Sequence, residues 1–248
     1  MPGFRAAATL ATVRGHLIDC GPCPYLPERT FQAFQPADDV APIYRDLMDL
    51  RFRRSGRVFY LPRCAGCQAC RPLRIDIAAF RPRRDQRRCA RRNHDLTVTW
   101  AGRGSDAERE ALYRRYETTV HGRSVTDDGA LASLADGGGV DGGELHARDA
   151  DGRLVAVSIV DRFADALSSV YCYYDPDRAD RALGTFMVLG EIAQAHAAGL
   201  AWLYLGFHVA DAPKMRYKAR FYPHQILVDG RWRTYREPDA SPVGSAGA

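Results

Sequence analysis

The stretch ELHARDADGRLVAVSIV, residues 144–160, decides the fold class of this 248-residue chain. The polar segment DADG at 149–152 follows an alternating polar and apolar run at 144–148 and precedes an apolar run at 154–160 that is rich in β-branched residues. Two strand-like runs separated by turn residues predict a β-hairpin. The second half of the chain is therefore expected to contain antiparallel strands.

The segments around this hairpin alternate between strand and helix patterns. The pattern predicts strands at 96–100, 167–174, 202–207 and 226–232, an amphipathic helix at 107–119, and a long apolar-striped helix at 182–198 that ends at Gly199. The glycine-rich run DGGGVDGG, 136–143, predicts a mobile loop or a boundary. This order of elements predicts an α+β fold and matches the core of the N-acyltransferase (GNAT) fold.

Composition excludes several classes of protein. With 46% hydrophobic and 26% charged residues the chain has the balance of an ordinary soluble globular protein. It contains no apolar run of the roughly 18–20 residues that a membrane helix needs. The N-terminus lacks a compact apolar core and a cleavage site, so we expect no signal peptide, no membrane partner and a cytoplasmic location.

Positive charge is concentrated in one segment. Residues 51–92 contain 14 arginines and two aspartates, a net charge of +12, whereas the remainder of the chain carries −7. Such clustering is typical of a site for a polyanion, with nucleic acid as the leading candidate. An Arg-rich solvated face is the alternative, because the whole chain has only two lysines and arginine is common in it.

Cysteines are interleaved with these arginines. The stretch CAGCQAC places thiols at 64, 67 and 70, and an earlier C-x-x-C pair adds Cys20 and Cys23. Four or five thiolates that converge would hold zinc or an iron–sulfur cluster, with Cys23 as the fourth partner and Cys20 as a substitute. The alternative is a set of small buried thiols in tight turns.

The arginines and cysteines together predict an N-terminal subdomain. We expect a Cys- and Arg-rich domain over 1–95, a GNAT-like acyltransferase domain over 96–235 and a disordered tail over 236–248. Within the first domain the patterns predict helices at 42–52 and 86–92 and strands at 58–61 and 74–78. Arginines that this scaffold would present to a phosphate backbone are Arg53, Arg54, Arg84, Arg87 and Arg88.

Two C-terminal stretches carry further candidate residues. The run KMRYKARFYP, 214–223, contains the two lysines Lys214 and Lys218 with Tyr217 and Arg220, and its cations would hold a phosphate or a carboxylate. The run YCYYDP, 171–176, contains Tyr173 and Tyr174, whose rings would stack on a base or line an acyl pocket. A solvated basic helix face and ordinary aromatic packing are the respective alternatives.

These motifs together resemble the bacterial aminoacyl-tRNA–protein transferases. The stretches CPYLP (23–27), FRRSG (52–56), CAGCQACRPLRI (64–75) and FRPRRDQRR (80–88) resemble the first half of that family, and DPDRADRALGT (175–185), LYLGF (203–207) and KMRYKARFYP (214–223) resemble the second half. The basic motif departs from the family pattern, which has serines where this chain has Arg83 and Asp85. The short chain resembles the leucyl-transferring branch of the family rather than the arginyl-transferring branch.

The resemblance implies an enzyme that transfers leucine from charged tRNA to the α-amine of proteins with N-terminal Asp or Glu. It implies that this transfer marks them for N-degron proteolysis through a downstream protease adaptor. It implies that Arg181 belongs to the tRNA face, that Lys218 and Arg220 pair with the acidic side chain, and that Tyr173, Tyr174 and Tyr204 shape the reaction pocket. Transfer itself is expected to need no cofactor, because the aminoacyl ester is already activated. Arginyl transfer, an acetyl-CoA-dependent N-acetyltransferase and a non-enzymatic RNA-binding module stay open as alternatives.

Overall fold

The computed structural model describes residues 13–237 and divides the chain into two compact units. Unit 1 contains residues 13–81, 138–140 and 204–237, and unit 2 contains residues 82–137 and 141–203. This division differs from the expected domains 1–95 and 96–235. The difference arises because strand β5 from the first part of the chain pairs with strand β11 near its end. The expected tail lies outside the described residues except for its first two positions.

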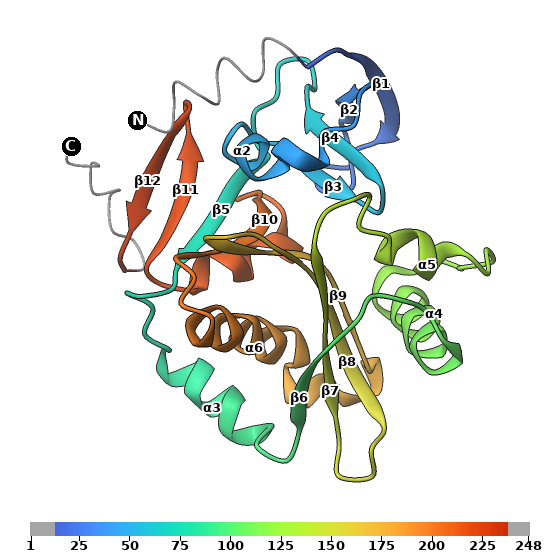
Figure 1. The fold of residues 1–248 in the computed structure, drawn as a ribbon, viewed down its shortest axis with the longest axis vertical. Helices are drawn as coiled ribbons and strands as arrows, with labels where there is room; N and C mark the ends of the chain where they lie inside the picture. Colours follow the sequence, from blue (N-terminus) through green and yellow to red (C-terminus); the bar gives the residue numbers. More distant parts are fainter. Residues whose placement is uncertain (1–12, 238–248) are drawn as a thin grey trace. The chain divides into compact units, whose positions relative to one another are not determined.

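Unit 1 contains two groups of hydrogen-bonded strands (Figure 1). The first group has the strand order β1-β2-β4-β3, and the second has the order β12-β11-β5-β10. Their bounds are β1 Gly15–Pro22, β2 Thr30–Pro36, β3 Arg53–Ser55, β4 Val58–Pro62, β5 Arg71–Asp76, β10 Trp202–His208, β11 His224–Val228 and β12 Arg231–Tyr235. Three short helices complete the unit: η1 Ala41–Ile43, α2 Tyr44–Asp49 and η3 Pro213–Arg220.

Unit 2 is an antiparallel sheet with the strand order β9-β8-β7-β6 (Figure 1). Its elements are α3 Arg84–Arg92, β6 Thr97–Ala101, α4 Ala107–His121, α5 Ala130–Ala135, β7 Gly142–Arg148, β8 Leu154–Arg162, β9 Ala166–Tyr174, η2 Pro176–Arg181 and α6 Leu183–Ala197. The predicted α+β class is confirmed, as are the hairpin β7–β8 and the long helix. Gly199 follows α6 with a positive φ of 66°, as expected of a residue that ends a helix.

Helices cover both faces of the unit 2 sheet. On one face α4 and α5 pack through Leu112, Tyr116 and Leu131 against Val157 and Tyr173. On the other face α6 contributes Leu183 and Met187, which belong to one core cluster with Leu145 and Ala147 of β7 and residues of β8. Because both faces of the sheet are covered, β8 is buried along nearly its whole length, from Leu154 to Asp161.

The glycine run at 136–143 was predicted to be a mobile loop or a boundary, and divisions between the two units fall within it, after residues 137 and 140. Its last two residues are part of a strand. Gly142 and Gly143 are the first two residues of β7, where they pair with Asp161 and Val160 of β8. A Cβ on Gly143 would lie 2.6 Å from Cε2 of Trp100, because the indole packs directly on the backbone there. These two glycines are therefore required for close packing within the sheet.

His224 gives unit 1 a pH-dependent stability. Its ring lies between Tyr222 and Tyr235, and its Nδ1 is 3.1 Å from the carbonyl oxygen of Phe221. Burial lowers the pKa of His224 to about 4, and the hydrogen bond to Phe221 opposes that shift only in part. The unfolded chain therefore binds a proton at higher pH than the folded one, so stability is present above pH 6.5 and is lost as pH falls towards 4.

We expect unfolding of the wild-type protein to cost about 2 kcal/mol less at pH 5 than at pH 7.5 on account of this one ring. Urea unfolding at the two pH values, followed by circular dichroism, measures the difference. The His224→Gln variant removes the titrating group and should have a smaller pH dependence by that amount. An equal pH dependence in the variant and the wild type would contradict the assignment to His224.

Candidate functional site

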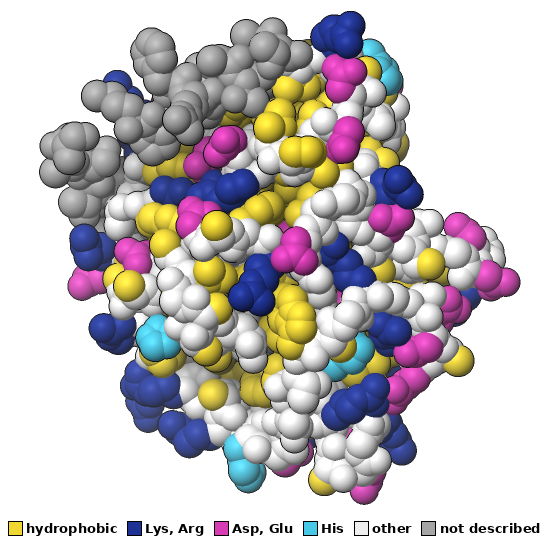
Figure 2. All heavy atoms as spheres, viewed as in Figure 1, with side chains coloured by type: hydrophobic (Ala, Val, Ile, Leu, Met, Phe, Trp, Pro, Cys, Tyr) yellow, Lys and Arg dark blue, Asp and Glu magenta, His cyan; other side chains and the backbone are white. Residues whose placement is uncertain are grey.

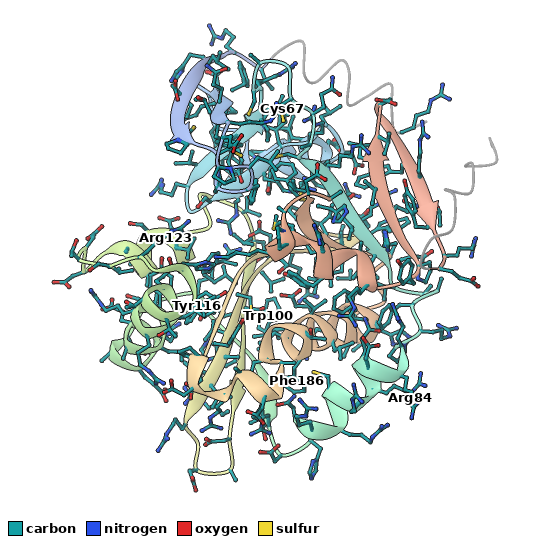
Figure 3. All side chains as sticks on the ribbon, turned by 180° about the vertical axis from the view of Figure 1, so that it is seen from behind. Cys67, Arg84, Trp100, Tyr116, Arg123 and Phe186 are labelled. Atoms are coloured by element: carbon teal, nitrogen blue, oxygen red, sulfur yellow. The ribbon has the colours of Figure 1, made fainter. Side chains whose placement is uncertain are left out.

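Helix α3 presents an exposed basic face. Gln86 and Cys89 are buried, whereas Arg84, Arg87, Arg88 and Arg91 are exposed. The Gln86 side chain accepts the Arg83 backbone N–H at 2.8 Å, which fixes the start of the helix. Arg84 lies at the N-terminal end of α3 (Figure 3), and dark-blue side chains follow the lower left edge of the surface where α3 lies (Figure 2). Three of the predicted tRNA-binding arginines, Arg84, Arg87 and Arg88, therefore share one accessible helix face.

Arg181 has a different role from the one predicted. Its Nε donates to Asn93 Oδ1 at 2.9 Å, and its guanidinium also bonds the Arg92 carbonyl and pairs with Asp95. The hydrogen bond between the Arg181 guanidinium and the Asp95 carboxylate lowers the pKa of Asp95. The Asn93 amide donates in return to the Arg181 carbonyl at 2.8 Å. Arg181 thus ties the loop before α6 to the end of α3, and its guanidinium is already engaged.

Arg53 and Arg54 do not belong to an RNA-binding face. Each is only 5% exposed. Arg53 Nη1 donates to the Met48 carbonyl at 3.1 Å, and Arg54 Nη1 donates to the Gly56 carbonyl at 2.7 Å. The prediction for these two residues is wrong because their strand lies inside unit 1, where an RNA phosphate has no access to them.

The three candidate pocket tyrosines lie in different surroundings. Tyr204 of β10 is fully buried in unit 1, and Tyr173 of β9 is fully buried in unit 2. A ring without exposed surface cannot touch a substrate, so the predicted catalytic roles of Tyr204 and Tyr173 are corrected to positioning and packing. Tyr174 is half-buried, and its ring atom Cε1 lies 3.2 Å from where a Cβ on Gly184 would be, at the start of α6.

Two of these tyrosines have buried hydroxyls with contrasting partners. The Tyr204 hydroxyl donates to Asp49 Oδ1 at 2.6 Å and accepts from Arg74 Nη1 at 3.0 Å. Burial raises the pKa of Tyr204 to about 12, so the phenol is neutral at pH 7. The Tyr173 hydroxyl has no hydrogen-bond partner within the described residues, and burial raises its pKa as well. Tyr174 lies against Tyr116 of α4 with 4.8 Å between ring centroids; Figure 3 labels Tyr116.

The predicted substrate-binding residues lie together on η3. Lys214, Tyr217 and Arg220 are exposed, and Lys218 is half-buried. Lys218 Nζ donates to the Phe207 carbonyl at 3.0 Å, which joins η3 to the end of β10. Gly206 precedes Phe207 with φ of 75°, and a Cβ there would be 3.6 Å from Lys218 Nζ. The lysine therefore lies beside a strand position that has no side chain.

The N-terminal thiols are neighbours in unit 1. Cys23 and Cys70 are buried, Cys64 and Cys67 are half-buried and Cys20 is exposed. Burial raises the pKa of Cys70 to about 12, and the nearby thiols of Cys23, Cys64 and Cys67 raise it further. Figure 3 labels Cys67, which lies in the loop between β4 and β5.

In the described residues, these thiols are not arranged as a metal-ligand set. Within residues 13–237, no three side chains of His, Cys, Asp or Glu are grouped so that they could hold a metal ion. The Cys64 thiol instead contacts the backbone of Gln32, accepting its N–H at 3.4 Å. The guanidinium of Arg51 lies beside the same thiols, and Nη2 donates to the Cys70 carbonyl at 3.4 Å. A metal-bound state would need movement of these side chains, so metal binding stays a prediction.

Sequence reasoning missed one polar group in unit 1. Arg45, Asp49 and Arg74 converge on the Tyr204 hydroxyl and ring, and Arg74 also stacks on Trp232 at 4.1 Å. Arg74 was part of a recognised motif, but its partners come from four different elements. The sequence contains no local signal for such a convergence.

Comparison with known proteins identifies the family. The family profile described as "Arginine-tRNA-protein transferase, N terminus" matches residues 21–88, and the profile for the C terminus matches residues 108–228. The protein named "Aspartate/glutamate leucyltransferase" from Chromobacterium violaceum is 40% identical over 239 residues, which is 94% of this chain and 98% of that protein. The chain belongs to the aspartate/glutamate leucyltransferase family.

Further comparisons agree with this membership. A member of the leucyltransferase family from Nitrosococcus oceani is also 40% identical, over 87% of this chain and 93% of that protein. The chain is thus a transferase, as predicted. The C-terminal domain of a putative lysylphosphatidylglycerol synthetase from Agrobacterium fabrum has a similar fold, with a TM-score of 0.51, 10% identity and coverage of 94% and 90% of the two chains. In residues 13–237 no helix is long and apolar enough to cross a membrane.

Proposed function

We propose that this protein transfers leucine from charged tRNA to the α-amine of proteins whose N-terminal residue is Asp or Glu. The observation that carries the proposal is the 40% identity to a named aspartate/glutamate leucyltransferase along nearly the full length of both chains. The modified protein would enter N-degron proteolysis in the cytoplasm, with a protease adaptor as the downstream partner.

The transfer needs little chemical activation. The α-amine nitrogen attacks the ester carbonyl carbon of the aminoacyl-tRNA and forms a C–N bond. The bond to the terminal ribose oxygen breaks, that oxygen gains a proton, and the amine loses one. A free α-amine has a pKa near 7.7–8.0, so a useful fraction is already neutral at pH 7. Positioning of the two substrates is then the main catalytic contribution, and it can be large.

The tRNA would bind along α3. Its exposed arginines lie on one face of the helix, where each can contact a phosphate. Cys89 is buried on the opposite face, and the Asn93 side-chain amide donates to the Cys89 carbonyl at the end of the helix. Arg53, Arg54 and Arg181 are left out of this surface because they are buried or already paired.

Lys218 and Arg220 are the proposed cations for the acidic acceptor side chain, with Lys214 and Tyr217 next to them. The Lys218→Ala variant should lower kcat/KM for peptides with N-terminal Glu at least tenfold, because a charge-assisted contact contributes about 1.5–3 kcal/mol. The matched control is Arg231→Ala, which removes an exposed cation from β12, outside the proposed site. Equal kinetics for Lys218→Ala and the control would remove Lys218 from the site.

A transfer assay tests the proposed function directly. Purified protein is incubated with labelled leucyl-tRNA, arginyl-tRNA or acetyl-CoA, together with peptides that start with Asp, Glu, Arg or Ala. We expect label from leucyl-tRNA on the Asp and Glu peptides alone. Label from arginyl-tRNA alone would support the arginyl alternative, and label from acetyl-CoA would support an N-acetyltransferase. RNA binding without any transfer would support the alternative that the protein is a non-enzymatic RNA-binding module.

A metal or iron–sulfur cluster is not needed for this reaction. The residues that would hold one are Cys20, Cys23, Cys64, Cys67 and Cys70. A thiol has to lose its proton to bind a metal, and burial raises the pKa of Cys70 to about 12, which opposes that loss; the Arg51 guanidinium beside the thiols also opposes a second cation. No step of the proposed transfer depends on this group.

A further inference from the structure

Helix α3 is tied to the start of helix α6 by reciprocal hydrogen bonds. Arg181 Nε donates to Asn93 Oδ1 at 2.9 Å, and the Asn93 amide donates to the Arg181 carbonyl oxygen at 2.8 Å. The same amide donates to the Cys89 carbonyl oxygen near the end of α3 at 2.9 Å. The Arg181 guanidinium also pairs with Asp95. We call the three side chains of Asn93, Asp95 and Arg181 the α3–α6 latch.

Asn93 is the enclosed centre of the α3–α6 latch. Its relative exposure is 0%, whereas the side chains of Arg181 and Asp95 are 16% and 43% exposed. A buried amide that loses a partner leaves polar atoms unsatisfied, so these hydrogen bonds hold α3 and Arg181 in one arrangement. Because no substrate can touch Asn93, any effect of this residue on a reaction must pass through its neighbours.

Further contacts hold the same loop along its backbone. The carbonyl oxygens of residues 180–182 accept hydrogen bonds from three side chains at the end of α3. In the same order, the donors are Arg92, Asn93 and Cys89. Cys89 Sγ lies 3.5 Å from the last of these oxygens, and Figure 1 shows α3 alongside α6. Helix α3 therefore cannot shift relative to the start of α6 without breaking several hydrogen bonds.

The loop that the latch holds leads directly to a candidate residue of the reaction pocket. Ala182, the last loop residue, has a φ of 52°, which is unusual for a residue with a side chain and indicates that its surroundings enforce it. In the first turn of α6, a Cβ on Gly184 would lie 3.2 Å from the Tyr174 ring. Of the three candidate pocket tyrosines, Tyr174 is the one with exposed surface. The latch thus fixes the backbone against which Tyr174 lies.

The opposite face of α3 carries the arginines proposed to bind tRNA. Arg84, Arg87 and Arg88 are exposed, whereas Cys89 is buried on the side of the latch. In the proposed complex, one helix contacts tRNA with one face and the start of α6 with the other. The placement of α3 therefore determines where the bound tRNA lies relative to Tyr174.

We propose that the α3–α6 latch positions bound tRNA for the transfer step, with Asn93 as its central positioning residue. The amine nitrogen and the ester carbonyl carbon must approach to about 3–3.5 Å before they react. A shift of α3 relative to α6 would move the ester away from the reaction pocket while the tRNA stays bound to the exposed arginines. The latch therefore acts on the rate of transfer and not on the affinity for tRNA. This inference rests on the proposed function and names the residues that connect tRNA binding to the reaction.

Two substitutions break the latch without removing a charge. Asn93→Ala deletes the central amide, and Arg181→Lys keeps the positive charge but loses the Nε donor to Asn93. For each variant, tRNA affinity is measured by fluorescence anisotropy, and leucine transfer to a Glu peptide is measured in a single turnover at saturating leucyl-tRNA. We expect the rate to fall about 10- to 100-fold and the affinity to stay within about twofold of the wild type. The double variant should be no slower than the slower single variant, because both changes break one link.

The matched control is Arg178→Lys. Arg178 lies in the same loop, but its Nη2 donates to Asp149 Oδ2 at 2.7 Å, in the turn between β7 and β8. This variant loosens the loop on the side that does not face α3, so it should keep the wild-type rate at saturating leucyl-tRNA. Thermal unfolding of every variant shows which of them are folded and compares their loss of stability.

The outcomes separate the latch from its alternatives. A wild-type rate in either folded latch variant would overturn the inference, as would an equal fall in rate in Arg178→Lys. A loss of tRNA affinity with an unchanged saturating rate in Arg181→Lys would also overturn it and assign Arg181 to RNA contact. Additive losses in the double variant would contradict a single link. If the wild-type protein transfers no leucine to Asp or Glu peptides, the proposed function itself fails.

Discussion

Replacing Arg84, Arg87 and Arg88 together by glutamine is expected to weaken tRNA binding about 100-fold at physiological salt. The three side chains are exposed on one face of α3, so each can contact a phosphate without rearrangement. Glutamine keeps the helix propensity of the segment, so the loss would come from charge and not from unfolding. Affinity is measured by filter binding or fluorescence anisotropy with charged tRNA.

The salt dependence of binding gives this prediction a second readout. Each phosphate contact contributes roughly 0.7–0.9 to the slope of log affinity against log salt, so the triple variant should lose about 2–3 in that slope. A matched triple variant removes the same charge from exposed positions near the end of the described chain. It replaces Arg231, Arg233 and Arg236 by glutamine. If the two triple variants lose affinity and slope equally, binding depends on total charge and α3 is not the contact surface.

Gly142→Ala is expected to destabilise the protein by about 3 kcal/mol or more, the largest stability effect of a single methyl group that we expect. A Cβ at this position would overlap the Val160 carbonyl oxygen and lie 2.9 Å from Asp161 Cα. These are backbone atoms of the paired strand β8, which cannot move away without breaking the register of the sheet. Calorimetry should show a melting temperature lower by about 10 °C.

Gly152→Ala is the control for this prediction. Gly152 also has a positive φ, 79°, but a Cβ there has no heavy atom within 4 Å. Its substitution should therefore cost only about 1 kcal/mol, the cost of placing alanine in a left-handed conformation. Similar melting temperatures for the two variants would mean that β7 can shift, contrary to the packing described above.

The regular elements of unit 2 could be predicted because their patterns are local. The hairpin 144–160 and the helix ending at Gly199 depend on residue alternation and turn chemistry within about 20 residues. The glycine run contains the predicted boundary, but composition alone did not show that its last residues form a strand that needs glycine for close packing. Gly142 and Gly143 are these residues.

The burial and the partners of the candidate site residues were predicted less well, because they depend on tertiary packing. A strand covered by helices on both faces gives no sign of which tyrosine is buried, so Tyr173 and Tyr174 could not be distinguished. Arg53 and Arg84 are the same residue type in one basic segment, yet one is buried and the other exposed. Their difference depends on tertiary packing, as does the convergence of Arg45, Asp49 and Arg74 on Tyr204.

The pairing of β5 with β11 has a consequence for synthesis of the protein. These strands are separated by about 150 residues, and His224 of β11 pairs with Ile75 of β5. On the ribosome, residues 82–203 emerge before the partner of β5 exists, so unit 2 can complete its sheet while the first 81 residues wait. A stalled or truncated chain would therefore expose Leu73 and Ile75 of strand β5, with the edge that pairs with β11 left unpaired. Synthesis of β11, residues 224–228, is thus the step that lets β5 complete its pairing.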